Sequence, residues 1–521
     1  MPRNGSDEPA GAEAGGLQAR ELQARALRGF TWSSLSSVFA LPLAIVVSIV
    51  VARTLGPEGY ARLAYLTFLV PLLLSLSDIG FAQATTRAAS QAFASGDLAR
   101  TRELIGKALG WNLLRLPFLC GFVLAVARPG ALGAALVVAF LVVSTAGAGL
   151  VFSLHAENRG ATLAKLAIID GLAVGGASTA AALLGAAPTT VWAAAFASGA
   201  VVAPGWLIAA NPELRRAALT PRLPRGLTSA FWRFGILSLA ASTGYVLVFS
   251  RSEVVVLEAL GEQQALAVFA LAYGLSQRLT TPIDTLLGPL TTALSALQGA
   301  HPHRFRAGFE RALRLSAVAV GFLAATGLVG VALLAPLMYG DEFAGVGPAF
   351  VALAVVSLLQ SVAQPYMALA YASGRPAILI RALAIALVAD VAVAVALIPL
   401  LGLWGAVVAN AVGGLTALAL MMRSAAGPAS LRVANVPAGR LATVTLAACA
   451  AAYAAGAAGG ALHAAVGAAA AFAVGTTTFL ALVAATGGLL PKQDVDVLVG
   501  ALPGRLRFAA RGAQLLTRAK Q

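Results

Sequence analysis

The chain has few charged residues, few cysteines and no long polar segment that could fold as a soluble domain. Only 11% of its 521 residues are Asp, Glu, Lys or Arg, against roughly 25% in a soluble domain. A soluble protein of this length would not have enough polar side chains to cover its surface. The composition therefore excludes a soluble enzyme, a nucleic-acid-binding protein and a disordered chain.

The sequence also lacks the usual metal and nucleotide motifs. Its two cysteines, Cys120 and Cys449, lie in apolar runs and form no C-x-x-C pair, so we expect no disulfide scaffold. No two of the four histidines have the spacing of a helical metal site. The only Gly-Lys pair, Gly106-Lys107, is followed by Ala108, where a nucleotide-binding loop needs Ser or Thr. We expect no cofactor, no bound metal and no enzymatic activity.

Long apolar runs are what the sequence has in abundance. Hydrophobic residues make up 59% of the chain, and the mean hydropathy is +0.85. A bilayer core is crossed by ~20 helical residues, and about fourteen runs reach this length. They cover residues 31–52, 61–82, 108–127, 131–153, 162–184, 188–210, 233–259, 264–296, 315–337, 346–371, 377–399, 402–422, 441–462 and 464–490. The pattern predicts an all-α integral membrane protein.

The basic residues support this division. Thirty of the 36 Lys and Arg fall in the two ends of the chain and in alternate loops, whereas the other loops hold only Arg53, Arg62 and Arg128. The positive-inside rule places Lys- and Arg-rich loops in the cytoplasm. Both termini are therefore expected to be cytoplasmic. The net charge of +15 is explained mainly by the basic cytoplasmic loops and only secondarily by ligand binding.

Both ends of the chain alternate apolar and basic residues. This pattern, in residues 17–30 and 504–520, is typical of helices that lie on an anionic lipid surface. The alternative is a solvated terminus. Residues 1–16 are rich in Gly, Ala and acidic side chains, which predicts disorder.

Two segments of the chain resemble each other, which indicates an internal repeat. Residues 55–60 (LGPEGY) and 260–263 (LGEQ) each follow an apolar run, precede another one, and are followed later by a strongly basic loop. Parallel repeats of this kind are one plan of membrane transporters. The predicted organisation has a disordered or amphipathic N-terminus (1–30), an N-lobe of six helices (31–210), a basic linker (211–232), a C-lobe of six helices (233–422), an extra helix pair (441–490) and an amphipathic tail (491–521).

The chain also resembles a known family. Residues 52–60 (ARTLGPEGY) and 77–81 (SDIGF) are similar to the first helical pair of the polysaccharide (Wzx-type O-antigen) flippases, and residues 402–406 (GLWGA) fit the same pattern. These flippases belong to the multidrug/oligosaccharidyl-lipid/polysaccharide exporter superfamily. The resemblance covers roughly residues 25–425. It implies two six-helix bundles around a central cavity and alternation between inward- and outward-facing states.

The resemblance also implies a cargo, namely an oligosaccharide on an undecaprenyl diphosphate carrier. We expect a monomer in the bacterial cell membrane that flips this cargo from the inner to the outer leaflet. Its expected partners are the cargo, anionic lipids and polysaccharide-assembly proteins, with no nucleic acid.

Three arginines lie at membrane depth, where a charge costs at least about 2.5–3.5 kcal/mol. Arg251 and Arg278 lie in the seventh and eighth expected spans, and Arg115 lies in the third. Arginines that line a lumen form charge-assisted hydrogen bonds with phosphate. We therefore expect Arg251 and Arg278, and secondarily Arg115, to contact the diphosphate. The alternative for each is an ion pair that packs helices, with Glu253, Asp284 and Asp170 as the acids considered.

Two acids and one turn complete the predicted site. Asp390 and Asp78 are candidates for proton or cation coupling, although Asp78 is also placed to cap a helix at the interface. Gly56, Pro57 and Gly59 fit a tight turn between two spans.

Other functions are open at this point. A multidrug/cation antiporter of the superfamily typically has an acid in its first span, and residues 31–52 contain no charge. A lipid II flippase also has fourteen spans but carries an arginine low in its first helix, which this chain lacks. A membrane glycosyltransferase or polymerase needs a sizeable outside loop, and the largest charged one, around residues 339–343, is short. A scaffold would not need charges at membrane depth.

Overall fold

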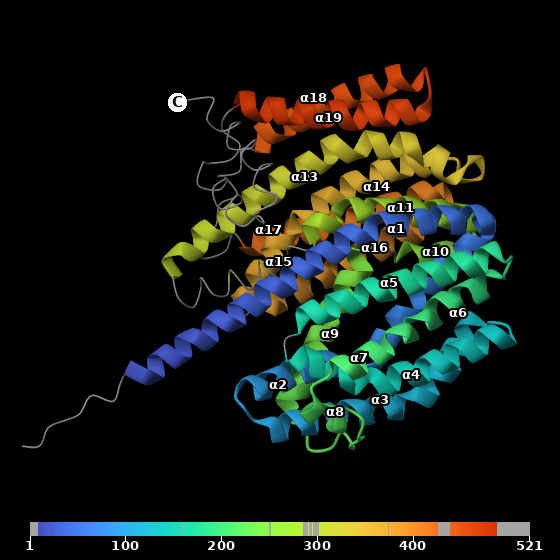
Figure 1. Ribbon diagram of the computed structural model, residues 1–521. Helices are drawn as coiled ribbons and strands as arrows, with labels where there is room; N and C mark the ends of the chain where they lie inside the picture. The colour runs from blue at the N-terminus through green and yellow to red at the C-terminus, as the bar shows by residue number, and fades with distance from the viewer. Residues whose placement is uncertain are drawn as a thin grey trace, which may run out of the picture. The chain divides into compact units, whose positions relative to one another are not determined.

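A computed structural model describes residues 9–157, 159–249, 252–284, 290, 294, 302–373, 375–425 and 438–486. Within these ranges, side chains are described from Leu41 onward except at residues 94, 302–304, 372, 376 and 425, and no strand occurs. The helices, labelled in Figure 1, are α1 (Pro9–Ser77), α2 (Phe81–Ala94), α3 (Leu98–Ala127), α4 (Ala131–Ala156), α5 (Gly160–Leu183), α6 (Pro188–Ser198), η1 (Gly199–Val202), α7 (Ala203–Ala209), α8 (Pro212–Ala218), α9 (Ser229–Phe249), α10 (Glu253–Ala259), α11 (Gln263–Asp284), α13 (Pro302–Tyr339), η2 (Asp341–Phe343), α14 (Val346–Ser361), α15 (Ala363–Ala372), α16 (Pro376–Leu401), α17 (Leu403–Ala425), α18 (Ala438–Gly460) and α19 (Ala464–Thr486).

Twelve of the described helical segments are long and apolar enough to cross a membrane, so the chain is a multi-pass membrane protein. Two of the fourteen expected spans account for the difference. The spans expected at 31–52 and 61–82 both belong to α1, which is broken at Gly56. The span expected at 264–296 begins as α11, which is more polar than the others. Because most residues of α11 between Leu266 and Ser276 are buried in protein, its polar side chains need not face lipid.

The second expected span ends earlier than predicted. It was expected to reach residue 82, but α1 ends at Ser77 and α2 begins at Phe81. The turn between them places Ile79 at φ 54° and Gly80 at φ 75°, a left-handed conformation that ends a helix. The same turn brings Gly80 against α9, where a Cβ on Gly80 would lie 2.0 Å from the carbonyl oxygen of Gly235. Only glycine fits this contact.

The chain forms two compact units. The first contains residues 1–47 and 70–239, and the second contains residues 48–69 and 240–521. In the first unit α3 packs against α4, and α6 packs against both α4 and α5. The short helix α2 is held by Phe81, which stacks on Trp111 of α3 at 5.1 Å and meets Trp232 of α9 at 5.6 Å.

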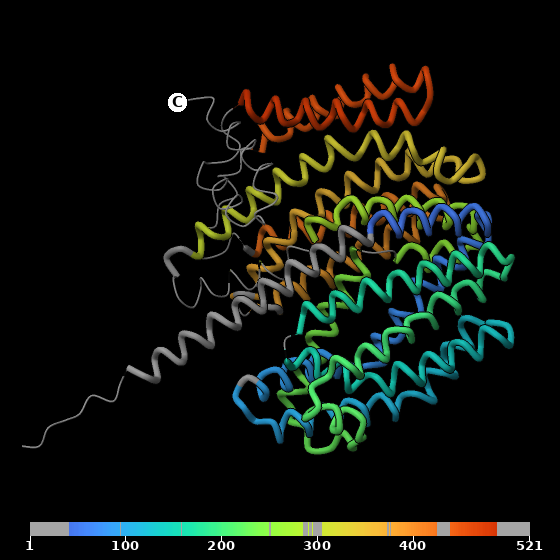
Figure 2. The backbone as a smooth tube through the Cα atoms, in the orientation of Figure 1, coloured from blue at the N-terminus to red at the C-terminus, as the bar shows by residue number. Residues whose placement is uncertain are grey.

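The second unit is built around α11, α13, α14, α16 and α17. The middle part of α1, residues 48–69, packs into this unit although its sequence precedes the rest of it. The last two helices, α18 and α19, run side by side in Figure 2 and both pack against α13. Glycines allow this close packing, since a Cβ on Gly475 would lie 2.1 Å from the carbonyl oxygen of Ala325.

Two expected features lie outside the described side chains. These are the amphipathic faces of residues 17–30 and of the C-terminal tail. The predicted phosphate ligand Arg251 also lies outside the described residues.

Candidate functional site

Arg115 and Asp78 form an ion pair within the first unit. Arg115 Nη1 lies 2.5 Å from Asp78 Oδ1, and the two side chains are 14% and 12% exposed. Asp78 Oδ2 also accepts a hydrogen bond from the backbone N–H of Ala82 at 2.7 Å, in the first turn of α2. Two residues with separate predicted roles are thus partners of one another.

This pairing corrects one expectation from the sequence. The acids considered as partners for the arginines were Glu253, Asp284 and Asp170, whereas Arg115 pairs with Asp78. The reason is the turn after Ser77, which ends α1 early and leaves Asp78 facing α3. Because its carboxylate is shared between Arg115 and α2, Asp78 is a poorer candidate for ion coupling than Asp390.

Arg278 lies in the second unit, on α11, and is half-buried. Its Nη1 lies 3.5 Å from Ser48 Oγ, and Ser48 Oγ lies 3.0 Å from Tyr339 Oη. Arg278 also interacts directly with the Tyr339 hydroxyl. Ser48 and Tyr339 are only 8% and 2% exposed. Arg278 is therefore the accessible end of a hydrogen-bonded group in which two buried hydroxyls hold its guanidinium, and a guanidinium suits a phosphate oxygen.

Two acidic side chains meet in the core of the second unit. Glu253 at the start of α10 and Asp390 in α16 are each 1% exposed, and their carboxyl groups interact. Asp390 Oδ2 accepts a hydrogen bond from Ser252 Oγ at 2.7 Å, and Glu253 also interacts with Asn410 of α17. A low-dielectric interior disfavours two neighbouring carboxylate charges, so this pair is a candidate site for a shared proton or a bound cation.

The backbone makes room for this acidic pair. A Cβ on Gly413 of α17 would lie 2.7 Å from Cβ of Asp390. Sequence reasoning identified Asp390 but considered Glu253 only as an ion-pair partner. The signal that could have found the pair is simple, since both acids interrupt apolar runs. In the described part of the chain no group of three or more His, Cys, Asp and Glu could hold a metal ion.

The turn residues lie where α1 breaks. Gly56 has φ 65° and ψ 179°, and Pro57 follows it. Gly261, in the repeated segment between α10 and α11, has a similar φ of 75°. Both turns thus use a glycine in the left-handed region, where other residues are strained.

The residues around the Gly56 break are anchored within the second unit. Arg53 donates from Nε to the carbonyl oxygen of Met338 at 2.8 Å and from Nη2 to that of Leu337, at the C-terminal end of α13. These carbonyls have no partner within the helix, and a cation is favourable there. Arg62 Nη1 lies 3.2 Å from Glu258 Oε1 of α10. The region around Gly56 is therefore held on both sides by arginines.

Comparison with known proteins identifies similar sequences and folds. Residues 26–294 match the family model described as polysaccharide biosynthesis protein. No curated protein matches the chain. An inward-facing multidrug resistance MATE family transporter of the MOP superfamily is 16% identical, with a TM-score of 0.57, over 76% of this chain and 98% of that one. The lipid II flippase MurJ in an inward closed conformation is 11% identical, with a TM-score of 0.55, over 87% of this chain and 98% of that one. These similarities show a shared fold.

Proposed function

Because the chain belongs to the polysaccharide biosynthesis protein family, we propose that it translocates a lipid-linked oligosaccharide from the inner to the outer leaflet of a bacterial cell membrane. The family and the transporter fold support membrane transport in general. The oligosaccharide on undecaprenyl diphosphate is the finer part of the proposal. Both termini are proposed to be cytoplasmic, as the loop charges suggest.

The observation that carries the cargo proposal is the guanidinium of Arg278, which the hydroxyls of Ser48 and Tyr339 hold in place. A diphosphate must keep its negative charge solvated while it crosses a layer without water. A half-buried guanidinium supported by two hydroxyls offers charge-assisted hydrogen bonds at that depth. Arg251, which lies 27 residues earlier in the sequence, is proposed as a second contact. Arg115 is the third and weakest, because Asp78 already neutralises it.

The acidic pair of Glu253 and Asp390 is the basis for a proposal about how transport is driven. We propose that this pair takes up and releases one proton during alternating access. The low exposure of both carboxyl groups and their direct interaction mean that a change of solvent access changes which protonation state is stable. Asp78 is the secondary candidate for this role.

The test is a leaflet-to-leaflet transport assay in proteoliposomes with a fluorescent undecaprenyl-diphosphate oligosaccharide. Arg278→Ala is expected to slow transport by at least about tenfold, since it removes a charge-assisted contact worth ~1.5–3 kcal/mol. Arg278→Lys keeps the charge and is expected to retain part of the activity. Arg225→Ala, an exposed arginine between α8 and α9, is the matched control. Unchanged transport by Arg278→Ala and Arg251→Ala would remove the phosphate-site proposal.

A further inference from the structure

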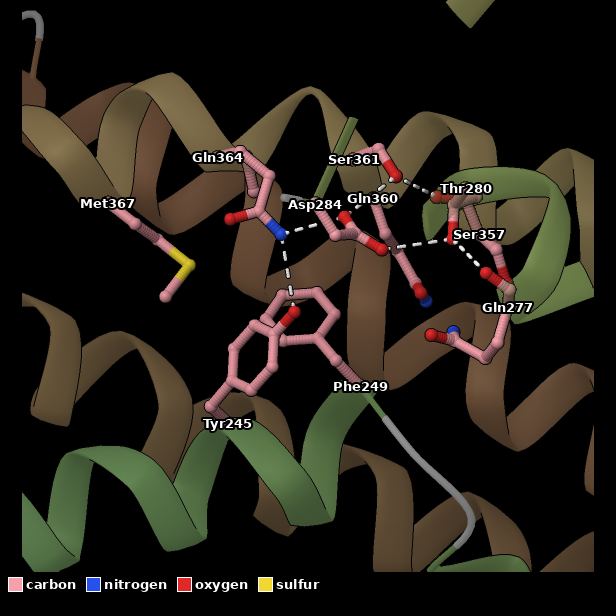
Figure 3. Close-up of a pocket in the computed structure, with 11 residues that line it drawn as sticks. Tyr245, Phe249, Gln277, Thr280, Asp284, Ser357, Gln360, Ser361, Gln364 and Met367 are labelled. Atoms are coloured by element: carbon pink, nitrogen blue, oxygen red, sulfur yellow. Dashed lines mark hydrogen bonds between the residues drawn. The ribbon is translucent and has the colours of Figure 1, made fainter. Parts of the chain in front are cut away.

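A polar pocket lies inside the second unit, apart from the Glu253–Asp390 pair. Figure 3 shows that α9, α11, α14 and α15 each contribute side chains to it. Asp284, the last residue of α11, is the one acid among the described residues that line the pocket. Most of its other polar groups are hydroxyls and amides, including Thr280, Ser361, Gln364 and Tyr245.

Neutral donors surround the Asp284 carboxylate. Thr280 Oγ1 donates to Oδ2 at 3.0 Å, Gln364 Nε2 donates to Oδ1 at 3.0 Å, and Ser361 Oγ lies 3.5 Å from Oδ1. In the described ranges no Lys or Arg forms a salt bridge with Asp284. A carboxylate buried in a membrane protein is costly and usually marks an ion or proton pathway.

A second acceptor lies in the same pocket. Gln364 is 5% exposed, and its Oε1 has no hydrogen-bond donor among the described residues. Its Nε2 donates both to Asp284 and to Tyr245 Oη, the latter at 3.2 Å, as the dashed lines in Figure 3 show. Half a turn of the amide would present Oε1 to the same space. After this rotation the amide would present an acceptor to Asp284 in place of a donor.

The small size of the pocket limits which ligands it can bind. Its hollow measures about 280 Å³ including the part open to solvent, but the space between the side chains holds no more than about one water-sized molecule. A sugar ring or a lipid headgroup is too large for this space. The oxygen atoms of carboxylates, hydroxyls and amides are the ligands that hard cations prefer. One carboxylate balances a single positive charge, whereas a divalent ion would keep an uncompensated charge at membrane depth.

We propose that this pocket binds a sodium ion, with Asp284, Thr280, Ser361 and the carbonyl oxygen of Gln364 as ligands. The site joins α11 to α14 and α15, so bound sodium would fix the packing of these helices in the second unit. Sodium binding stands independently of the cargo. The idea that sodium drives transport rests on the proposed function. Helix α11 carries both Asp284 and Arg278, so sodium and cargo would bind to the same helix.

The test is binding of radioactive sodium to the purified full-length protein in detergent at constant pH and ionic strength, with choline replacing sodium. We expect binding by the wild type, its loss in Asp284→Asn, and a reduction of about tenfold or more in Thr280→Val. Asp341→Asn, a change at an exposed acid outside the pocket, is the control and should bind as the wild type does. Asp390→Asn tests whether sodium binds at the Glu253–Asp390 pair instead.

Three results would overturn the site: no sodium binding by the wild type, unchanged binding by Asp284→Asn, or loss in Asp390→Asn alone. A thermal unfolding scan shows whether each variant is folded, and Ser361→Ala replaces Asp284→Asn if that variant fails to fold. Failure of oligosaccharide transport with intact sodium binding would count against the proposed cargo and leave the ion site standing.

Discussion

Arg115 of α3 holds Asp78 at the end of α1 through a nearly buried ion pair, with Nη1 2.5 Å from Oδ1. The same carboxylate accepts the N–H of Ala82, so α1, α2 and α3 meet at one side chain. A residue that appears from the sequence to be free for coupling is thus part of the structure of the first unit.

We predict that Asp78→Ala lowers stability strongly. It leaves the Arg115 guanidinium buried without its counter-charge, a loss of ~3–5 kcal/mol for a buried pair. The measurement is thermal unfolding in detergent of Asp78→Ala, Arg115→Met and the double variant. The double variant should be more stable than Asp78→Ala alone, since no charge is then left unpaired. Additive losses in the double variant would show that the pair has no structural role.

A steric prediction concerns Gly80, which is at φ 75° and faces the carbonyl oxygen of Gly235. Gly80→Ala introduces both a clash and a left-handed alanine, and we expect a loss of at least about 1–2 kcal/mol from the backbone alone. Gly171→Ala in α5 is the control, because a Cβ there meets nothing within 4 Å. Size-exclusion profiles and unfolding temperatures of the two variants measure the difference. Equal behaviour would mean that the contact between α9 and the Gly80 turn is not tight.

The Arg62–Glu258 ion pair provides a charge-swap test within the second unit. Its side chains are 31% and 20% exposed, so the pair contributes only ~0.2–1 kcal/mol to stability. Arg62→Glu should impair transport by repelling residues 48–69 from α10, and the double variant Arg62→Glu with Glu258→Arg should restore most of it. The rate of lipid transport in proteoliposomes is the readout. If the swap restores nothing, the attraction between these two charges is not what positions this segment.

A fourth prediction concerns proton coupling by Glu253 and Asp390. Asp390→Asn leaves one neutral amide in place of an acid that can exchange its proton, so transport should no longer respond to an imposed pH gradient. Transport with and without the gradient measures this, with Asp341→Asn as the exposed control. An Asp390→Asn protein that still follows the gradient would move the proton site elsewhere, with Asp78 as the next residue to test.

The architecture could be predicted from the sequence because the bilayer imposes a simple requirement. Apolar runs of helical length separated by basic loops are enough to indicate an all-α membrane protein, and the resemblance to polysaccharide flippases is confirmed by the family match. The turn at Gly56 could also be predicted, because a Gly-Pro pair favours a turn at its own position in the chain. Features that depend on neighbouring residues in the sequence, such as spans and turns, can therefore be predicted from it.

Contacts between distant residues could not be read in this way. Asp78 and Arg115 come together because α1 ends at Ser77, and nothing in the sequence marks that end clearly. The Asp284 pocket had a visible signal in Gln360 and Gln364, two amides four residues apart in an apolar run. Which acid they surround depends on how α11 packs against α14 and α15, and periodicity does not give that.

A side-by-side transport measurement decides which cargo the protein moves. Proteoliposomes should be offered a fluorescent undecaprenyl-diphosphate oligosaccharide, lipid II and a cationic drug under the same conditions, with Arg278→Ala as the inactive reference. We predict rapid movement of the oligosaccharide lipid, much slower movement of the other two, and loss of the oligosaccharide signal in Arg278→Ala. Efflux of the drug, or flipping of lipid II, without movement of the oligosaccharide lipid would contradict this prediction.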